Sequence, residues 1–146
     1  MAPMVNSIEI SRSPEDVFAY VTDPSHLAEW QESVVSVHAD SPLTVGGKAV
    51  ITRRVGRGER TMINEVTEVT PPRSWRLRGI DGPIRGSVKG TVEPLDEGRR
   101  SRVTIALDFE GHGIGKVLLP FVVRRQVRAE MPRNLERLKE RLENGA

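Results

Sequence analysis

The C-terminal part of the chain carries one apolar stripe of helical period, and no other feature constrains the fold as strongly. The members of the stripe are spaced four, four, three and four residues apart: Val127, Met131, Leu135, Leu138 and Leu142. This spacing predicts a long amphipathic helix whose other faces carry charged residues. A helix of this kind must bury its stripe, so the chain before it has to supply an apolar surface.

That surface is predicted by a change of period in the middle of the chain. Between residues 34 and 109 hydrophobic and polar residues alternate, most clearly over Val103–Phe109, as is typical of strands with one buried face. Turn-forming residues separate the runs, at Gly56-Arg57-Gly58, Pro71-Pro72 and Asp96-Glu97-Gly98. Runs joined by successive hairpins predict a mostly antiparallel meander of strands.

The N-terminal region predicts one further strand and two short helices. Met4–Ser11 alternates as a strand does, and Ser13-Pro14-Glu15-Asp16 has the order of a helix start: a capping Ser, Pro in the first turn, then two acids. A second short helix begins at Pro24 and carries Trp30. The whole pattern predicts an α+β fold over residues 1–146 as a single domain. It consists of a curved seven-stranded sheet around the C-terminal helix, with two short helices between the first two strands.

Composition excludes several classes of function. The 146 residues contain no Cys, which rules out a disulfide framework. The three His are dispersed, and the formal net charge is only +2, so we predict no metal, no cofactor and no nucleic-acid partner. We find no apolar run long enough for a membrane span and no signal-peptide pattern, and therefore expect a cytoplasmic protein.

Four segments resemble a known superfamily. Ser13–Pro24 and Leu27–Trp30 look like the first helical pair of START-like (SRPBCC) proteins, Val69–Trp75 is similar to their central hairpin, and Asn134–Lys139 resembles their C-terminal helix. The resemblance spans nearly the whole chain and implies a helix-grip fold with a ligand cavity between the concave sheet and the long helix. Members include polyketide aromatases and cyclases, lipid and sterol carriers, quinone-binding chaperones and hormone receptors. The motifs are structural and therefore specify the fold better than the activity.

Given a cavity in that place, strand parity nominates the side chains that line it. The strand candidates are Ile51, Arg53, Trp75, Leu77, Val88, Gly90, Ile105 and Leu107. The helical candidates are Trp30, Leu118, Phe121 and Val122. An apolar lining with few polar groups suits a hydrophobic ligand, and the alternative is a filled core without a cavity.

Arg53 is the most informative of these residues. It shares strand parity with Ala49, Ile51 and Val55. An Arg that points into a cavity must be paired or face a ligand anion such as a carboxylate, a phosphate or a polyketide enolate. The alternative is that the parity slips near the Gly-rich hairpin and leaves Arg53 in solvent.

Catalysis would need a further group. A cyclase requires a base that removes a proton next to a carbonyl, and His38 and His112 are the candidate histidines. Tyr20 could act with His38 as a proton donor, although nothing in the spacing brings the two together. A lone His on a strand is also compatible with a surface position.

Three functional hypotheses follow from the sequence. The first is a protein that binds a hydrophobic small molecule, such as a lipid, a quinone or a polyketide, for transport or sequestration. The second is a polyketide cyclase or aromatase that uses acid/base groups in the same cavity. The third is a protein-interaction module that uses the basic cluster of the last helix, Arg124, Arg125 and Arg128.

Overall fold

The computed structural model describes residues 3–40, 42–82, 84–111 and 118–145. Within these residues seven strands form one antiparallel sheet in the order β1-β7-β6-β5-β4-β3-β2. The strands are β1 (Met4–Ile10), β2 (Val34–Ala39), β3 (Lys48–Val55), β4 (Gly58–Thr70), β5 (Ser74–Gly79), β6 (Ile84–Leu95) and β7 (Arg100–Gly111). The predicted meander is confirmed, because from β2 to β7 each strand pairs with the next one along the chain.

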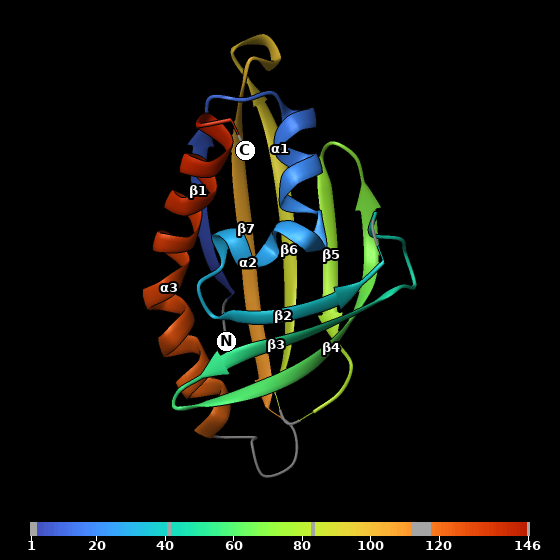
Figure 1. Cartoon of the computed structure of the whole chain (residues 1–146), viewed down its shortest axis with the longest axis vertical. Coiled ribbons are helices and arrows are strands. Elements are labelled where there is room, and N and C mark those ends of the chain that lie inside the picture. Colours follow the sequence, from blue (N-terminus) through green and yellow to red (C-terminus); the bar gives the residue numbers. More distant parts are fainter. Residues whose placement is uncertain (1–2, 41, 83, 112–117, 146) are drawn as a thin grey trace.

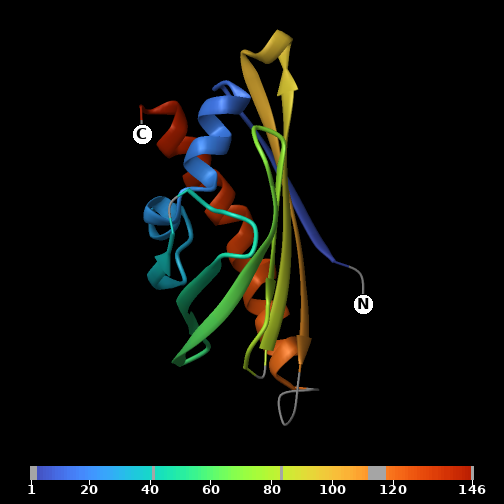
Figure 2. The same ribbon diagram turned by 90° about the vertical axis from the view of Figure 1, so that its right-hand side faces the viewer.

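The α-helices and the 3-10 turn η1 lie on one side of this sheet (Figure 2). They are α1 (Pro14–Val21), η1 (Pro24–His26), α2 (Leu27–Trp30) and α3 (Leu118–Glu143), and a second 3-10 turn, η2 (Asp96–Gly98), connects β6 and β7. Figure 1 shows β2 and β3 running across the direction of β6 and β7, so the sheet is strongly curled. A curled antiparallel sheet around a long C-terminal helix confirms the predicted α+β helix-grip fold.

The start of α1 follows the local sequence. The Ser13 side chain accepts a hydrogen bond from the backbone N–H of Asp16 at 3.3 Å, Pro14 occupies the first turn, and two acidic residues follow. These groups satisfy and complement the free N–H groups at a helix N-terminus. Asp23 caps η1 in the same way, accepting from the backbone N–H of Ser25 at 2.9 Å.

The apolar stripe of α3 packs where the sequence predicts. Met131, Leu135, Leu138 and Leu142 are all buried and belong to one core cluster with side chains of β1, β6, β7 and α1. Val127, at the other end of the stripe, is only partly buried against this cluster. The C-terminal half of α3 is therefore the part that holds the helix to the sheet.

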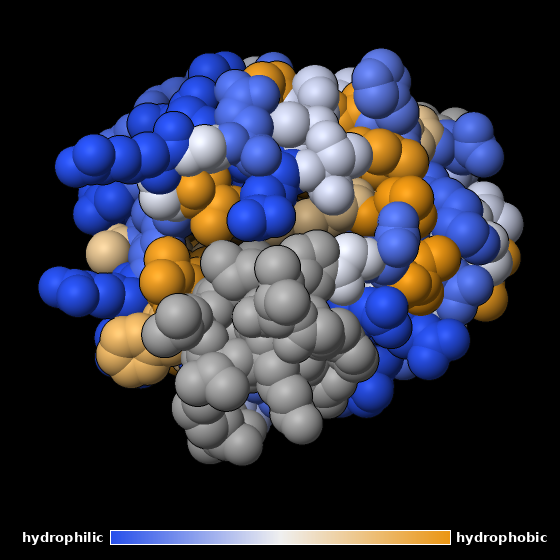
Figure 3. Space-filling model, turned by 90° about the horizontal axis from the view of Figure 1, so that it is seen from below, coloured by the Kyte–Doolittle hydropathy of each residue, from blue (hydrophilic) through white to orange (hydrophobic). Residues whose placement is uncertain are grey.

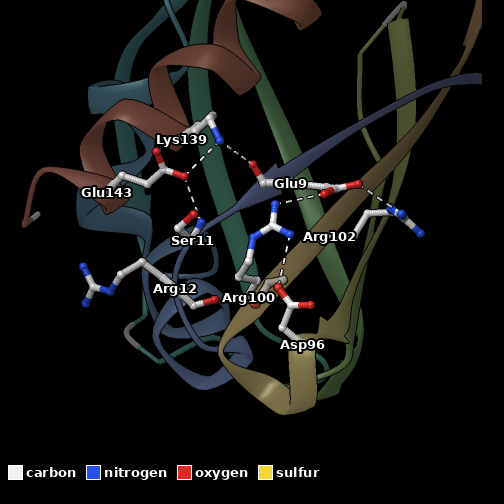
Figure 4. Close-up of polar contacts among 9 residues, drawn as sticks. Glu9, Ser11, Arg12, Asp96, Arg100, Arg102, Lys139 and Glu143 are labelled. Atoms are coloured by element: carbon white, nitrogen blue, oxygen red, sulfur yellow. Dashed lines mark hydrogen bonds and ion pairs between the residues drawn. The ribbon is translucent and has the colours of Figure 1, made fainter.

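A polar clasp adds to this packing (Figure 4). The ammonium group of Lys139 donates to the backbone carbonyl of Glu9 on β1 at 2.8 Å and pairs with the carboxylate of Glu143 at 2.9 Å. The Glu9 carboxylate pairs in turn with Arg100 and Arg102 of β7, and these two guanidinium groups lower its pKa. The clasp, defined here as Glu9, Lys139 and Glu143, fixes the C-terminal half of α3 to the edge strand.

The completely buried side chain of Leu138 tests how far the fold depends on this half of α3. We expect Leu138→Ala to lower the free energy of unfolding by about 3 kcal/mol, because truncation leaves a cavity in a packed core. The exposed Glu136→Ala on the same helix should change it by less than about 0.5 kcal/mol. Urea unfolding followed by circular dichroism measures both values. Equal effects of the two substitutions would show that α3 is not packed as described.

Candidate functional site

A cavity of about 170 Å³ lies between the concave face of the sheet and α3. It is also bounded by the end of α1, by η1 and by α2. Cavities for drug-sized ligands typically measure about 300–1,000 Å³, whereas an engineered cavity of about 150 Å³ in another protein binds benzene. The space between the two layers therefore matches a small compound better than a large one.

Most of the nominated residues lie in this lining, Trp30 from the short helix α2 and the others from the strands. They are Trp30, Ile51, Arg53, Trp75, Leu77, Val88, Ile105 and Leu107. Trp75 and Leu77 share the inner face of β5, as a period of two requires. Met62, Phe109 and Met131 also line the cavity and were not nominated. Phe109 and Met131 continue patterns visible in the sequence, the alternation of β7 and the stripe of α3.

Of the four remaining nominated positions, three lie outside the lining. Gly90 is covered by the indole ring of Trp75 and is not in the lining. Phe121 and Val122 have 65% and 42% of their surface exposed, so their predicted place in the cavity is wrong. The side chain of Leu118 is outside the part of the chain whose side chains the structure describes.

The helical phase of α3 explains the correction. Val123 lies four residues before Val127 and continues the apolar stripe to the cavity. Phe121 and Val122 precede Val123 by two and one positions and so fall on other faces of the helix. The end of the molecule at which α3 begins mixes hydrophobic with polar side chains on its surface (Figure 3).

Arg53 brings a positive charge to the apolar cavity. Its Nη1 donates to Gln31 Oε1 at 2.6 Å and to Ser33 Oγ at 3.4 Å. Among the described residues no protein group accepts from its Nε or Nη2. Burial lowers the pKa of Arg53 to about 10, which still leaves the guanidinium charged at neutral pH. Arg53 thus lines the cavity with donors to spare, and the register of β3 with β4 is regular on both sides of it.

Glu130 of α3 is the acidic group of the same lining. Desolvation by burial raises its pKa, and the negative charge of Glu32 adds to this effect. A hydrogen bond with Gln126 and the positive charges of Arg133 and Arg53 act in the opposite direction without cancelling it. Glu130 therefore holds a proton at a higher pH than an exposed Glu does.

Two further polar side chains are buried in the lining. The Asn134 Oδ1 accepts from the backbone N–H of Glu32 at 3.1 Å. The indole N–H of Trp30 is buried, and no acceptor lies within hydrogen-bond distance of it among the described residues. Such a group is costly in a folded protein, so this wall of the cavity is not optimised for stability alone.

The residues nominated for catalysis do not meet in the cavity. His38 is exposed on β2, and neither His38 nor Tyr20 belongs to the lining. The buried Tyr20 hydroxyl donates to Glu29 at 2.7 Å, and its ring stacks on His26 at a centroid distance of 4.4 Å. Burial and the Glu29 contact raise the pKa of Tyr20. His112 lies outside the described residues.

Only two of the three arginines in the predicted basic cluster lie on the surface. Arg124 is only 6% exposed and pairs with Asp108 of β7, while Arg125 and Arg128 remain exposed.

Within the described part of the chain no three His, Cys, Asp or Glu side chains gather closely enough to hold a metal ion. None of the helices described here has the length and apolar character that crossing a membrane requires.

These features define a helix-grip protein whose largely apolar cavity also contains a basic and an acidic side chain, Arg53 and Glu130. A sequence profile described as "Polyketide cyclase / dehydrase and lipid transport" matches residues 1–143, and the chain belongs to this family. A comparison with curated proteins gives no match.

Solved structures share the fold at low sequence identity. An aromatase/cyclase, Zhui, from Streptomyces sp. R1128 superposes with a TM-score of 0.82 at 13% identity over 97% of this chain and 93% of that one. A conserved protein from Geobacillus kaustophilus gives 0.73 at 19% identity, covering 96% and 94%. The di-domain ARO/CYC BexL from the BE-7585A biosynthetic pathway gives 0.73 at 16% identity, covering 98% of this chain and 47% of that one.

Replacing Arg53 tests whether its charge serves stability. We expect Arg53→Met to raise the free energy of unfolding by about 1 kcal/mol, because methionine keeps much of the packing of the half-buried arginine and removes the cost of desolvating its charge. Arg60 of β4 lies opposite Arg53 of β3 in the sheet register, but its side chain is exposed. Arg60→Met is therefore the matched control and should leave the free energy of unfolding nearly unchanged. Urea unfolding of the three proteins gives the comparison. A clear loss of stability in Arg53→Met would make Arg53 a structural residue.

The raised pKa of Glu130 predicts a pH dependence of stability. A carboxyl group whose pKa is higher in the folded state contributes stability at low pH, and this contribution is lost as the pH rises through the folded-state pKa. Relative to Glu130→Gln, the wild-type protein should therefore become less stable as the pH rises from about 4.5. Urea unfolding of both proteins at several pH values measures this difference. A difference that does not change with pH would contradict the burial of Glu130.

Proposed function

We propose that this protein binds a small, hydrophobic ring compound that carries an anionic group, with the ring in the cavity and the anion at Arg53. One observation carries the proposal: an apolar cavity contains a desolvated guanidinium with unused hydrogen-bond donors. A desolvated cation without an anionic partner in contact is unfavourable, and a ligand carboxylate, phenolate or enolate would supply that partner. The family to which the chain belongs includes polyketide cyclases and lipid-transport proteins, which supports a hydrophobic ligand.

The size and lining of the cavity restrict the class of ligand. A volume of about 170 Å³ favours one or two rings over a long acyl chain. The rings of Trp30, Trp75 and Phe109 are all in the lining and offer faces and edges to a planar compound. Among the three classes named from the sequence, quinone- and polyketide-like compounds fit this lining better than lipids do.

Glu130 gives the anion site a second property. Its carboxylate and the ligand anion would repel each other across the same cavity, so anion binding should favour the protonated form of Glu130. Arg53 on β3 and Glu130 on α3 come from the two layers that enclose the ligand. The ligand would therefore meet one group that neutralises its charge and another that can hold a proton.

The same two groups support an alternative function as a polyketide cyclase. The Glu130 carboxylate would take a proton from a carbon next to a carbonyl, and the enolate oxygen would be stabilised by Arg53. The carbanion would attack a second carbonyl of the same chain to close a ring, and the resulting alkoxide would take the proton back from Glu130. Loss of this hydroxyl with a neighbouring C–H proton as water, followed by enolisation of the remaining ring carbonyls, would give an aromatic product. In this function Glu130→Gln would keep substrate binding and lose turnover, whereas a binding protein has no turnover to lose.

The first experiment is native mass spectrometry of the purified protein, followed by organic extraction and identification of any bound molecule. Isothermal titration calorimetry with 2-naphthoate and its neutral analogue 2-naphthamide then tests the anchor. We expect Arg53→Met to weaken 2-naphthoate binding about 10- to 100-fold, the range for a lost charge-assisted hydrogen bond, and to change 2-naphthamide binding by less than about threefold. Arg60→Met should leave both affinities unchanged.

The two Trp residues of the chain, Trp30 and Trp75, both line the cavity. A change in their intrinsic fluorescence therefore measures ligand binding independently of the calorimetric titration. Folded wild-type protein that takes up neither naphthalene probe, nor a quinone or a fatty acid, would overturn the proposed function. Equal weakening of both probes by Arg53→Met would retain the cavity and reject the anion site.

A further inference from the structure

We propose that two glycines of β6, Gly86 and Gly90, set the depth of the cavity and thereby the size of the ligand it accepts. This inference rests on the proposed function, because it concerns the selectivity of the same cavity. On β6 the inner face presents Gly86, Val88 and Gly90 in succession, and Gly86 and Val88 both line the cavity. Two positions on the inner face of β6 thus carry no side chain: Gly86 lies in the lining itself, and Gly90 lies beneath Trp75, which is in the lining.

An aromatic ring from a neighbouring strand occupies the space above each glycine. Gly90 pairs with Trp75 of β5, and a Cβ atom at Gly90 would lie 2.1 Å from Cζ2 of the indole. Gly86 pairs with Phe109 of β7, and a Cβ atom at Gly86 would lie 2.8 Å from Cε1 of the ring. Carbon atoms in contact are normally about 3.5–4.0 Å apart, so each ring lies where a side chain of β6 would otherwise stand.

Backbone conformation does not explain these glycines. Neither has the positive φ found at Gly46, Gly56 or Gly82, so other residues are compatible with the backbone at both positions. Glycine within a strand is unfavourable because it loses the most conformational freedom on folding. The property that glycine supplies here is space for the two rings.

The rings in turn define the floor of the cavity, because Trp75 and Phe109 are both in its lining. Trp75 also makes a T-shaped contact with Phe18 of α1, with ring centroids 5.9 Å apart and planes at 78°. A side chain at Gly90 would therefore have to displace Trp75 away from β6, toward the cavity or Phe18. At Gly86 the atom in the way is the far end of the Phe109 side chain, which can turn aside into the cavity.

The predicted consequence is a change in size selectivity. Gly86→Ala should weaken binding of the two-ring 2-naphthoate about tenfold and change binding of the one-ring benzoate by less than about threefold, since one methylene in an apolar pocket alters affinity about 10- to 200-fold. Phe109→Leu should act in the opposite direction and admit anthracene-2-carboxylate, which has three rings. Arg53 is unchanged in both variants, so the ratio of the affinities reports size alone.

Gly58→Ala is the matched control. Gly58 also lies in a strand, but it is exposed and a Cβ atom there meets nothing within 4 Å. Calorimetric titration of wild type, Gly86→Ala, Phe109→Leu and Gly58→Ala with the three carboxylates gives the affinity ratios, and circular dichroism confirms folding. If Gly86→Ala does not fold, Phe109→Leu alone still decides.

The outcomes separate this inference from the function on which it rests. Wild-type protein that binds benzoate and 2-naphthoate, together with a shifted ratio in the two cavity variants and an unchanged ratio in Gly58→Ala, supports the inference. Wild-type binding with the same ratio in every variant overturns it and leaves the proposed function intact. Wild-type protein that binds no carboxylate probe overturns both.

Discussion

The structure depends on the contact between one long helix and a sheet that curves away from it. The 26 residues of α3 cannot follow a strongly curled sheet along their whole length, so the helix packs closely over only part of it. Leu135, Leu138 and Leu142 are buried in the core, and the clasp secures the same half. Val123, Val127 and Glu130 face the cavity instead. The cavity is the space left where the two layers separate.

This division explains why polar groups that are unfavourable to desolvate lie at or beside the N-terminal half of α3. Arg53 and Glu130 are both disfavoured in their charged forms by desolvation, and the indole N–H of Trp30 is buried without an acceptor. A fold can carry such groups when the remaining core supplies the stability, and in natural proteins they gather at functional sites. The tightly packed half of α3 contains hydrophobic residues whose role is structural. The C-terminal half of α3 thus supplies most of the packing, and under the proposed function the cavity-lining residues between Val123 and Asn134 would contact the ligand.

The sequence predicted the fold well, because the signals that specify it are local and periodic. A strand has a period of two, so identifying one inward residue such as Trp75 also placed Leu77. The start of α3 was predicted less well, since Val123 belongs to the apolar stripe but Phe121 and Val122 are equally hydrophobic. Glu130 was missed because a charged residue beside an apolar stripe is normally solvated. His38 and Tyr20 could not be placed, because their neighbours depend on contacts distant in the sequence.

The position of Gly90 shows what kind of information periodicity omits. Strand parity placed Gly90 on the inner face of the sheet. It did not predict that the ring of Trp75 covers Gly90, which is the contact that requires a glycine there. The solved structures compared above share the fold at 13–19% identity, so the architecture tolerates replacement of most side chains. Under the proposed function, selectivity would reside in a few positions where a change alters the cavity and leaves the hydrogen bonds between strands intact. Glycines with an ordinary backbone conformation beneath aromatic rings meet this requirement, because adding a side chain there moves a ring and leaves the strand in place.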